Sequence, residues 1–202
     1  MVGVKNGGIF LRVGVDIDGV LADSLPLWVA EMNDYFKKNR QLEDIRLFDL
    51  CTVYEVTEEE VLRFMQLKGR ELMIKPPPME GAVFYLQEIK KHHEIYIVTA
   101  RDPCYEEETR WWLQKYGLLF DNLLLLGSHA KQGACLECKL NILVEDTLEV
   151  SLRVSAAGVP VILLDAPYNR SPLPELIIRK RSWAEIYQVL NFELEQLVVP
   201  TC

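Results

Sequence analysis

Residues 13–24 read Val13-Gly14-Val15-Asp16-Ile17-Asp18-Gly19-Val20-Leu21-Ala22-Asp23-Ser24, an apolar strand that runs straight into two carboxylates. The i, i+2 spacing puts Asp16 and Asp18 on the same side of the chain at the strand's end. Gly19 then permits a sharp turn whose backbone N–H groups can face an anion. Two close carboxylates repel each other, and a divalent hard cation is the usual means of neutralising them. The alternative, a solvated Asp-Gly turn, gives the acidic pair no role at the end of a buried strand.

Outward from this stretch, short runs rich in Val, Ile and Leu alternate with longer segments of helical period. Near-continuous apolar strands are typical of a parallel sheet covered on both faces. We therefore expect an α/β fold, an open, Rossmann-like, doubly wound sheet. The expected strands are 9–17, 95–99, 123–126, 142–144 and 159–164, and the expected helices are 105–116, 131–140 and 147–157, with Gly117 and Gly158 as helix C-caps.

One segment, residues 24–78, breaks this alternation with helical patterns and no strong strand. Leu25, Val29, Met32 and Phe36 form an amphipathic stripe. Residues 57–60 form a capping box that opens a helix through residue 67, and three prolines at 76–78 end the helical region. The pattern predicts an α/β core of residues 1–23 and 79–202 and a small helical cap of residues 24–78. We expect the cap to stand over the strand ends, where ligands bind in such sheets.

Composition limits the possible partners. The chain has 202 residues, 50% of them hydrophobic, and a net charge of −8, which fits one globular domain with or without a small insertion. An acidic chain without a basic stripe is a poor partner for DNA or long RNA, whereas a small phosphate ester remains compatible with it. Five scattered cysteines, no signal peptide and no membrane-length apolar run predict a soluble cytoplasmic protein. The oligomeric state is left open, a homodimer included.

The run Asp16-Ile17-Asp18-Gly19-Val20-Leu21 resembles the first signature of the haloacid dehalogenase-like superfamily. The resemblance implies that Asp16 attacks phosphorus and forms an aspartyl-phosphate. It implies that Asp18 protonates the leaving oxygen and later activates water. An aspartate at position 18 points to phosphatases and phosphomutases, because the ATPases of the superfamily carry threonine there.

Three further places match the superfamily in order and strand position. Thr99 ends an apolar run and matches the hydroxyl that bonds the phosphoryl group; Lys131 matches the lysine that neutralises phosphate from the start of a helix. The pair Glu145-Asp146 matches the acidic signature that completes a metal site. The implied cofactor is Mg²⁺, held by Asp16, a backbone carbonyl at Asp18, Asp146 directly, and Glu145 directly or through water.

Within the superfamily, four details resemble the 5'(3')-deoxyribonucleotidase-like group: residues 99–101, 144–147, 167–170 and 181–186, together with a cap placed after the first strand. The predicted phosphate-binding residues are Thr99, Ala100, Arg101 and Lys131. Arg101 either meets the phosphate bidentately or forms a surface ion pair. Asn169 and Arg170 either rim the site or form a turn.

The favoured function is Mg²⁺-dependent hydrolysis of a small phosphomonoester, with nucleoside 5'-monophosphates or deoxynucleotides as the preferred class. The alternatives are a sugar-phosphate phosphatase or a phosphomutase on the same machinery. A non-catalytic, phospho-accepting signalling domain is disfavoured, because such domains lack the long insertion at 24–78. Cys135 and Cys138 form a C-x-x-C, which we interpret as a helical pair and not a zinc site, since structural zinc takes four ligands.

Overall fold

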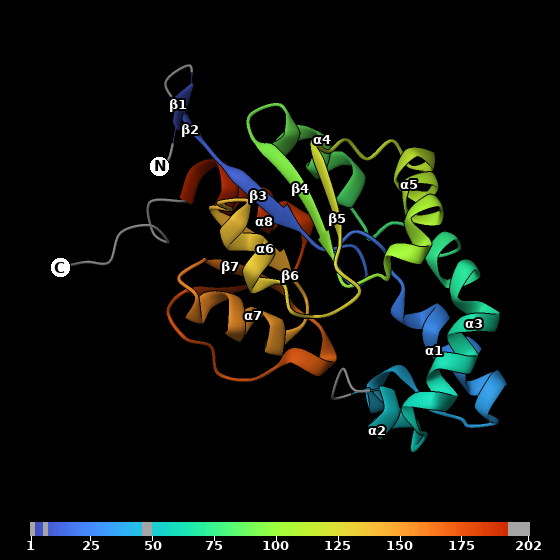
Figure 1. The fold of residues 1–202 in the computed structure, drawn as a ribbon. Helices are drawn as coiled ribbons and strands as arrows, with labels where there is room; N and C mark the ends of the chain where they lie inside the picture. Colours follow the sequence, from blue (N-terminus) through green and yellow to red (C-terminus); the bar gives the residue numbers. More distant parts are fainter. Residues whose placement is uncertain (1–2, 6–7, 46–49, 194–202) are drawn as a thin grey trace.

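A computed structural model describes residues 3–5, 8–45 and 50–193. Its centre is a six-stranded, all-parallel sheet in the order β5-β4-β3-β6-β7-β8 (Figure 1). The strands are β3 (Arg12–Val15), β4 (Glu94–Thr99), β5 (Asn122–Leu125), β6 (Ile142–Glu145), β7 (Val161–Leu164) and β8 (Ile177–Lys180). The predicted doubly wound α/β fold is confirmed.

Two hydrophobic clusters cover the two faces of this sheet. Along β6 and β7, alternate residues enter opposite clusters: Val144 and Ile162 one, Leu143 and Leu163 the other. This is the period of two that a strand imposes. The first cluster packs against α4 (Ala82–Lys90), α5 (Glu106–Lys115) and α8 (Trp183–Gln188), and the second against α6 (Gln132–Glu137) and α7 (Leu148–Ala156). The helices following β4, β5 and β6 were predicted, whereas α8 and β8 were not.

The predicted first strand, 9–17, is divided in the structure. Its first part belongs to a small antiparallel hairpin of β1 (Gly3–Lys5) and β2 (Gly8–Phe10), and the central sheet takes up the chain at Arg12. At the break, the Leu11 N–H donates to His93 Nδ1 at 3.4 Å. A hydrophobic pattern does not show which side chain will accept a backbone N–H, so the sequence did not reveal this break. The expected continuous strand 9–17 is wrong at residue 11.

His93 gives the fold a measurable acid sensitivity. Its side chain is buried, and burial, together with the neighbouring His92, lowers the pKa of His93 to about 4. The unfolded chain therefore binds this proton at higher pH than the folded one, so stability falls as pH drops from about 6.5 towards 4. We expect His93 to contribute about 2–3 kcal/mol to this loss of stability.

Urea unfolding of wild type and His93→Asn at pH 7 and pH 4.5 tests this contribution. The difference in unfolding free energy between the two proteins should narrow at pH 4.5, and a constant difference contradicts the assignment.

The segment after β3 forms helices, as predicted. They are α1 (Leu25–Phe36), a short 3₁₀ turn η1 (Leu42–Asp44), α2 (Leu50–Tyr54) and α3 (Glu58–Ile74), here called the cap helices. The predicted capping box opens α3, with the Glu60 N–H donating to Thr57 Oγ1 at 3.2 Å. The cap helices share a hydrophobic cluster of their own and lie beyond the ends to which the β-strands point (Figure 1). The division at residues 24 and 78 stays a prediction.

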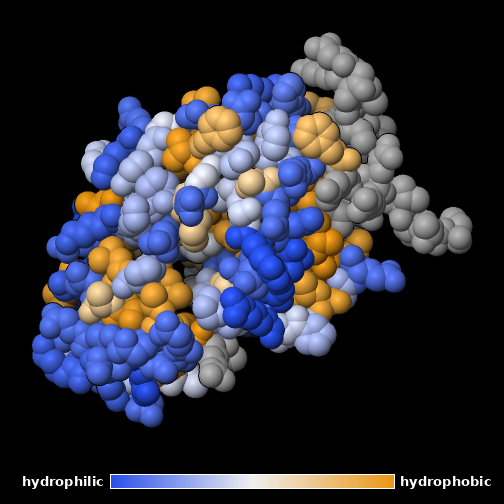
Figure 2. Space-filling model, turned by 180° about the vertical axis from the view of Figure 1, so that it is seen from behind, coloured by the Kyte–Doolittle hydropathy of each residue, from blue (hydrophilic) through white to orange (hydrophobic). Residues whose placement is uncertain are grey.

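On the rear face of the molecule, the hydrophobic residues lie in separate patches (Figure 2). Figure 2 shows hydrophilic residues over much of the rear face, with hydrophobic groups between them and not as one continuous band. Most of the large apolar side chains are instead buried in the three clusters already described. Among the described residues, no helix combines the length and apolar character needed to cross a membrane.

Candidate active site

Three adjacent strands, β4, β3 and β6, deliver the predicted site residues to one edge of the sheet. Asp16 follows β3, Thr99 ends β4 and Glu145 ends β6. Because parallel strands end together, residues far apart in sequence meet there. Lys131 joins them as the N-cap residue of α6. Asp16, Asp18, Thr99, Ala100, Arg101 and Asp146 all line one cavity of about 280 Å³.

The turn after β3 is held by one carbonyl. The backbone N–H groups of residues 20–22 all donate to the Ile17 oxygen, at 2.8–3.2 Å. Gly19 sits in this turn with φ at +81°, a conformation that disfavours other residues. A Cβ at Gly19 would also overlap the Asp146 carboxylate. Glycine is therefore required here both by backbone conformation and by the close approach of the acidic side chain.

Lys131 is fully buried between two carboxylates. Its Nζ lies 2.8 Å from Asp16 Oδ1 and 2.8 Å from Glu145 Oε2. Burial opposes its charge, but the two carboxylates outweigh burial and raise the pKa of Lys131. Glu145 Oε1 accepts the backbone N–H of Thr147 at 3.0 Å. Burial raises the pKa of Glu145, but Lys131 together with the hydrogen bonds from Thr147 and Asp146 outweighs burial, so the net pKa shift is downward. A buried ammonium and carboxylate are each ionised because of the other.

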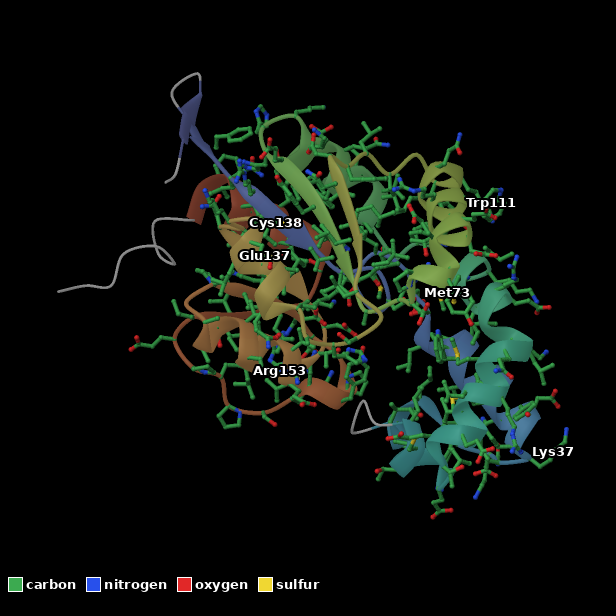
Figure 3. All side chains as sticks on the ribbon, viewed as in Figure 1. Lys37, Met73, Trp111, Glu137, Cys138 and Arg153 are labelled. Carbon is green, nitrogen blue, oxygen red and sulfur yellow. The ribbon has the colours of Figure 1, made fainter. Side chains whose placement is uncertain are left out.

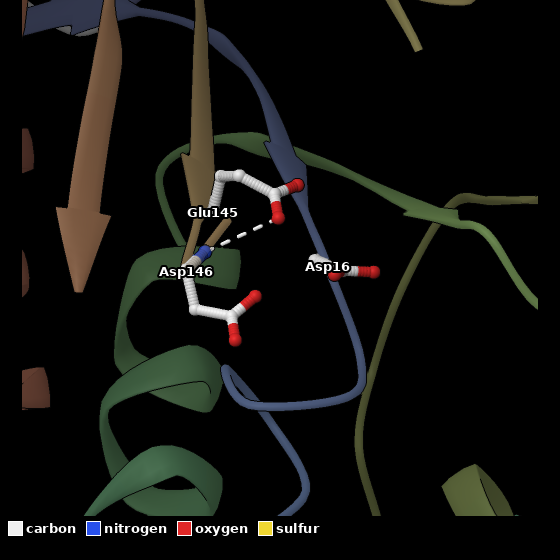
Figure 4. A group of neighbouring side chains, drawn as sticks. All are labelled: Asp16, Glu145 and Asp146. Carbon is white, nitrogen blue, oxygen red and sulfur yellow. Dashed lines mark hydrogen bonds between the residues drawn. The ribbon is translucent and has the colours of Figure 1, made fainter. Parts of the chain in front are cut away.

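The acid cluster, defined as Asp16, Glu145 and Asp146, carries more negative charge than Lys131 balances. One carboxylate oxygen from each lies within 4.8 Å of the others (Figure 4). Burial, with the neighbouring Glu145 and Asp18, raises the pKa of Asp16 to about 7 against the pull of Lys131. Burial, with the neighbouring Glu145 and Asp16, holds the pKa of Asp146 well above its usual range. These oxygen donors and their uncompensated charge fit a divalent cation such as Mg²⁺.

Asp146 is fixed by two residues of the 167–170 motif, Tyr168 and Asn169. The Tyr168 hydroxyl donates to Asp146 Oδ2, and Asn169 Nδ2 donates to the Asp146 carbonyl at 2.7 Å. Asn169 is buried, whereas Arg170 is exposed and pairs with Asp165 at 3.0 Å. The 167–170 motif was identified from the sequence as a feature of the deoxyribonucleotidase-like group. Of its residues, Tyr168 lines the cavity, whereas Asn169 and Arg170 do not.

Asp18 is held by Arg101. The guanidinium donates from Nε to Asp18 Oδ2 at 2.8 Å and from Nη2 to Asp18 Oδ1 at 2.9 Å. Arg101 is buried, so the surface ion pair considered for it is wrong. Thr99 Oγ1 is also buried and accepts the Arg101 backbone N–H at 3.2 Å. Binding of phosphate by Thr99, Ala100, Arg101 and Lys131 stays a prediction.

The cap helices contribute mainly apolar residues to the same cavity. The cavity is therefore lined both by these residues and by the strand-end carboxylates, the composition expected for a ligand with a polar head and an apolar body. The cap residues that line it are Ser24, Leu25, Trp28, Leu50, Val61, Met65 and Met73.

Comparison with known proteins assigns the chain that carries this site to a family. The family model described as "5' nucleotidase, deoxy (Pyrimidine), cytosolic type C protein" matches residues 10–196. The chain belongs to this family. It is a phosphatase of the haloacid dehalogenase-like superfamily, as its first motif predicted.

Individual proteins similar to this chain are also named as nucleotidases. The chain is 33% identical to a candidate nucleotidase of Halalkalibacterium halodurans, over 86% of this chain and 89% of the relative. It is 28% identical to a nucleotidase of Clostridium acetobutylicum, over 90% and 94%. It is also 28% identical to the 5'(3')-deoxyribonucleotidase of Bacillus subtilis, over 88% and 97%.

Solved structures show the same fold at low identity. A haloacid dehalogenase-like hydrolase of Streptococcus pneumoniae aligns with a TM-score of 0.69 at 16% identity, over 88% of this chain and 96% of that one. A candidate hydrolase of this superfamily from Bacillus subtilis, solved bound to magnesium, aligns with a TM-score of 0.64 at 14% identity, over 91% and 99%. This nucleotidase-family phosphatase thus has the fold of the whole superfamily.

Proposed function

We propose that this phosphatase hydrolyses nucleoside 5'-monophosphates, deoxynucleotides included, through an aspartyl-phosphate on Asp16 and with Mg²⁺ as cofactor. The observation that carries the proposal is the cavity itself, which is lined both by Asp16 and Asp18 and by aromatic and aliphatic residues of the cap helices. We further propose that the enzyme acts in the cytoplasm.

The reaction uses two carboxylates in two steps. Asp16 attacks phosphorus and displaces the nucleoside oxygen, to which Asp18 delivers a proton. Water then attacks the phosphoryl group on Asp16, Asp18 takes its proton, and inorganic phosphate leaves with Asp16 restored. Lys131, 2.8 Å from Asp16 Oδ1, holds that carboxylate in place and supplies positive charge beside the transferred group.

Mg²⁺, when bound, supplies positive charge that offsets the negative charge of the phosphoryl oxygens and the acid cluster. Asp16 and Asp146 are the proposed carboxylate ligands, with the Asp18 backbone carbonyl as a third donor. Both oxygens of Glu145 already accept bonds from Lys131 or the backbone. We therefore propose that Glu145 acts on the cation mainly through the orientation of Lys131. The magnesium-bound structural neighbour is consistent with this choice of metal.

The charges around the cavity favour an ester with a neutral leaving group. Of the described residues that line it, Arg101 alone carries a full positive charge, and Asp18 already neutralises it. Asp102 also lines the cavity. A second anionic group on the substrate would meet no unpaired cation there, which argues against phosphoglycolate and bisphosphates. An uncharged nucleoside meets only apolar surface and hydrogen-bonding groups.

A phosphate-release screen tests the function. We expect the highest kcat/KM for nucleoside 5'-monophosphates, with lower values for sugar monophosphates and the lowest for bisphosphates and phosphoglycolate. A preference for a sugar monophosphate supports the alternative sugar-phosphate phosphatase. Conversion of a sugar phosphate to its isomer without release of phosphate identifies a phosphomutase.

Trp28 should contribute to nucleoside binding. It lies on α1, half-buried, and its side chain lines the cavity. Stacking of a base on an aromatic side chain is worth about 1–3 kcal/mol, so Trp28→Ala should lower kcat/KM for a nucleotide about tenfold or more while leaving p-nitrophenyl phosphate within about threefold. Trp111→Ala is the matched control, because Trp111 is exposed on the outer side of α5 (Figure 3). Equal losses on both substrates for Trp28→Ala would remove its role in recognising the nucleoside.

A further inference from the structure

Arg101 contacts both parts of the molecule that meet at the cavity. Two of its N–H groups bind the Asp18 carboxylate, and Nη1 donates to the Met73 carbonyl at 3.2 Å and to Thr109 Oγ1 at 3.3 Å. An arginine side chain has five N–H donors, so these four bonds leave one. The guanidinium is therefore almost saturated by protein acceptors before a phosphate arrives.

The contacts make Arg101 the rigid member of its pair with Asp18. The Arg101 side chain is 2% exposed, whereas that of Asp18 is 22% exposed. Arg101 is further held through its backbone by Thr99 and through its side chain by the buried Thr109 of α5. A bidentate guanidinium fixes the plane of a carboxylate. The orientation of Asp18 thus follows from that of Arg101.

The Met73 carbonyl links this pair to the cap helices. Met73 lies in the last turn of α3, where carbonyls have no partner within the helix, and it lies where α3 approaches the core (Figure 3). Other bonds join the same part of the chain to the core: the Tyr105 hydroxyl donates to the Met65 carbonyl at 3.1 Å, and Trp112 Nε1 to the Pro76 carbonyl at 2.8 Å. One guanidinium therefore holds both Asp18 and the end of α3.

We propose that Arg101 is a positioning residue, which orients the Asp18 carboxylate for proton transfer and ties that orientation to the C-terminal end of α3. The inference rests on the proposed role of Asp18 as general acid and base. A positioning role for Arg101 has different kinetic consequences from direct binding of phosphate by Arg101. A positioning residue acts only where Asp18 matters, whereas a phosphate ligand acts on every phosphate ester equally.

Two esters of similar size separate these roles. p-Nitrophenyl phosphate has a good leaving group and needs little help from an acid, whereas benzyl phosphate releases a poor alkoxide. We compare kcat/KM, which reports the steps only as far as departure of the leaving group and therefore excludes the later hydrolysis of the aspartyl-phosphate. Since general acid catalysis contributes about 10²–10⁴ in rate, Arg101→Lys and Arg101→Met should lower kcat/KM about 30-fold or more on benzyl phosphate and less than about fivefold on p-nitrophenyl phosphate.

Inhibition by inorganic phosphate and a double mutant complete the test. The inhibition constant for phosphate should stay within about twofold, and Arg101→Lys should cost little further activity on benzyl phosphate in an Asp18→Asn background. Equal losses on both esters with weaker phosphate inhibition would overturn the proposal and make Arg101 a phosphate ligand. If Asp18→Asn itself shows no difference between the esters, the proposed role of Asp18 fails. If Asp18→Asn shows the difference and the Arg101 variants do not, only the Arg101 inference fails.

Hydrogen exchange tests the tie to α3 without any turnover. Arg101→Met should speed amide exchange in the last turns of α3, residues 66–75, because the Met73 carbonyl loses its partner. Asp18→Asn should leave exchange there unchanged. Trp111→Ala, at an exposed position of the same helix, controls for general loosening of α5. Unchanged exchange at residues 66–75 in Arg101→Met would overturn the link between α3 and Asp18.

Discussion

Asp16→Asn should lower kcat for any phosphate ester by at least about 10³-fold, because an amide oxygen is a poor nucleophile towards phosphorus and the covalent step is lost. The side chains have the same shape, so the fold should persist. Burial, together with repulsion from Glu145 and Asp18, raises the pKa of Asp16 to about 7, and the variant removes the cost of keeping this buried carboxylate charged. We therefore expect a thermal midpoint equal to or higher than that of wild type in chelator.

Asp23→Asn is the matched control for this variant. Asp23 follows the same turn, but its side chain is not among those that line the catalytic cavity, so activity should stay within about twofold. Both variants are measured by phosphate release and by thermal unfolding. More than a few per cent of wild-type activity in Asp16→Asn, at unchanged stability, would exclude Asp16 as the nucleophile.

Removal of divalent cations should have an effect of similar size. EDTA is expected to abolish turnover, and Mg²⁺ to restore it. Ca²⁺ should restore it poorly, because Ca²⁺ accepts looser geometry and longer bonds than Mg²⁺. Mg²⁺ should also raise the thermal midpoint, since a ligand that binds only the folded state stabilises it and the acid cluster is short of positive charge.

Asp146→Asn separates the metal site from general salt effects. This variant should lose both the activity and the Mg²⁺-dependent rise in thermal midpoint, while NaCl at the same ionic strength gives no such rise with wild type. Full activity of wild type in excess chelator would exclude metal-dependent hydrolysis. A Mg²⁺-dependent rise that persists in Asp146→Asn would place the cation elsewhere.

The sequence predicted the site residues whose positions depend on where the strands end in a parallel sheet. Asp16, Thr99 and Glu145 follow apolar runs, and parallel strands bring such positions together whatever the side chains between them. The cap helices were predictable for a similar reason, since the stripe in α1 and the capping box of α3 are local patterns. Strand β8 and helix α8 were missed, because their short segments carry little periodicity.

Side-chain partners were less predictable. Arg101 looked equally suited to a phosphate or to a surface ion pair, and only the packed structure places it against Asp18 and Met73. Tyr168 was invisible for the same reason: its contact with Asp146 joins residues 22 positions apart through a turn. A local pattern specifies which face a residue occupies, whereas its hydrogen-bond partner depends on how distant segments pack.

The order of strands also sets when the enzyme becomes complete during synthesis. The first strand of the sheet, β3, lies between β4 and β6, so its neighbours on both sides are translated later. Until residue 145 has left the ribosome, Asp16 has neither Lys131 nor Glu145 beside it in a finished sheet. Strand β3 therefore has an unpaired edge until β6 is synthesised, whereas the cap helices can already pack against one another. Any nascent chain released before β6 would retain the nucleophile and lack the site.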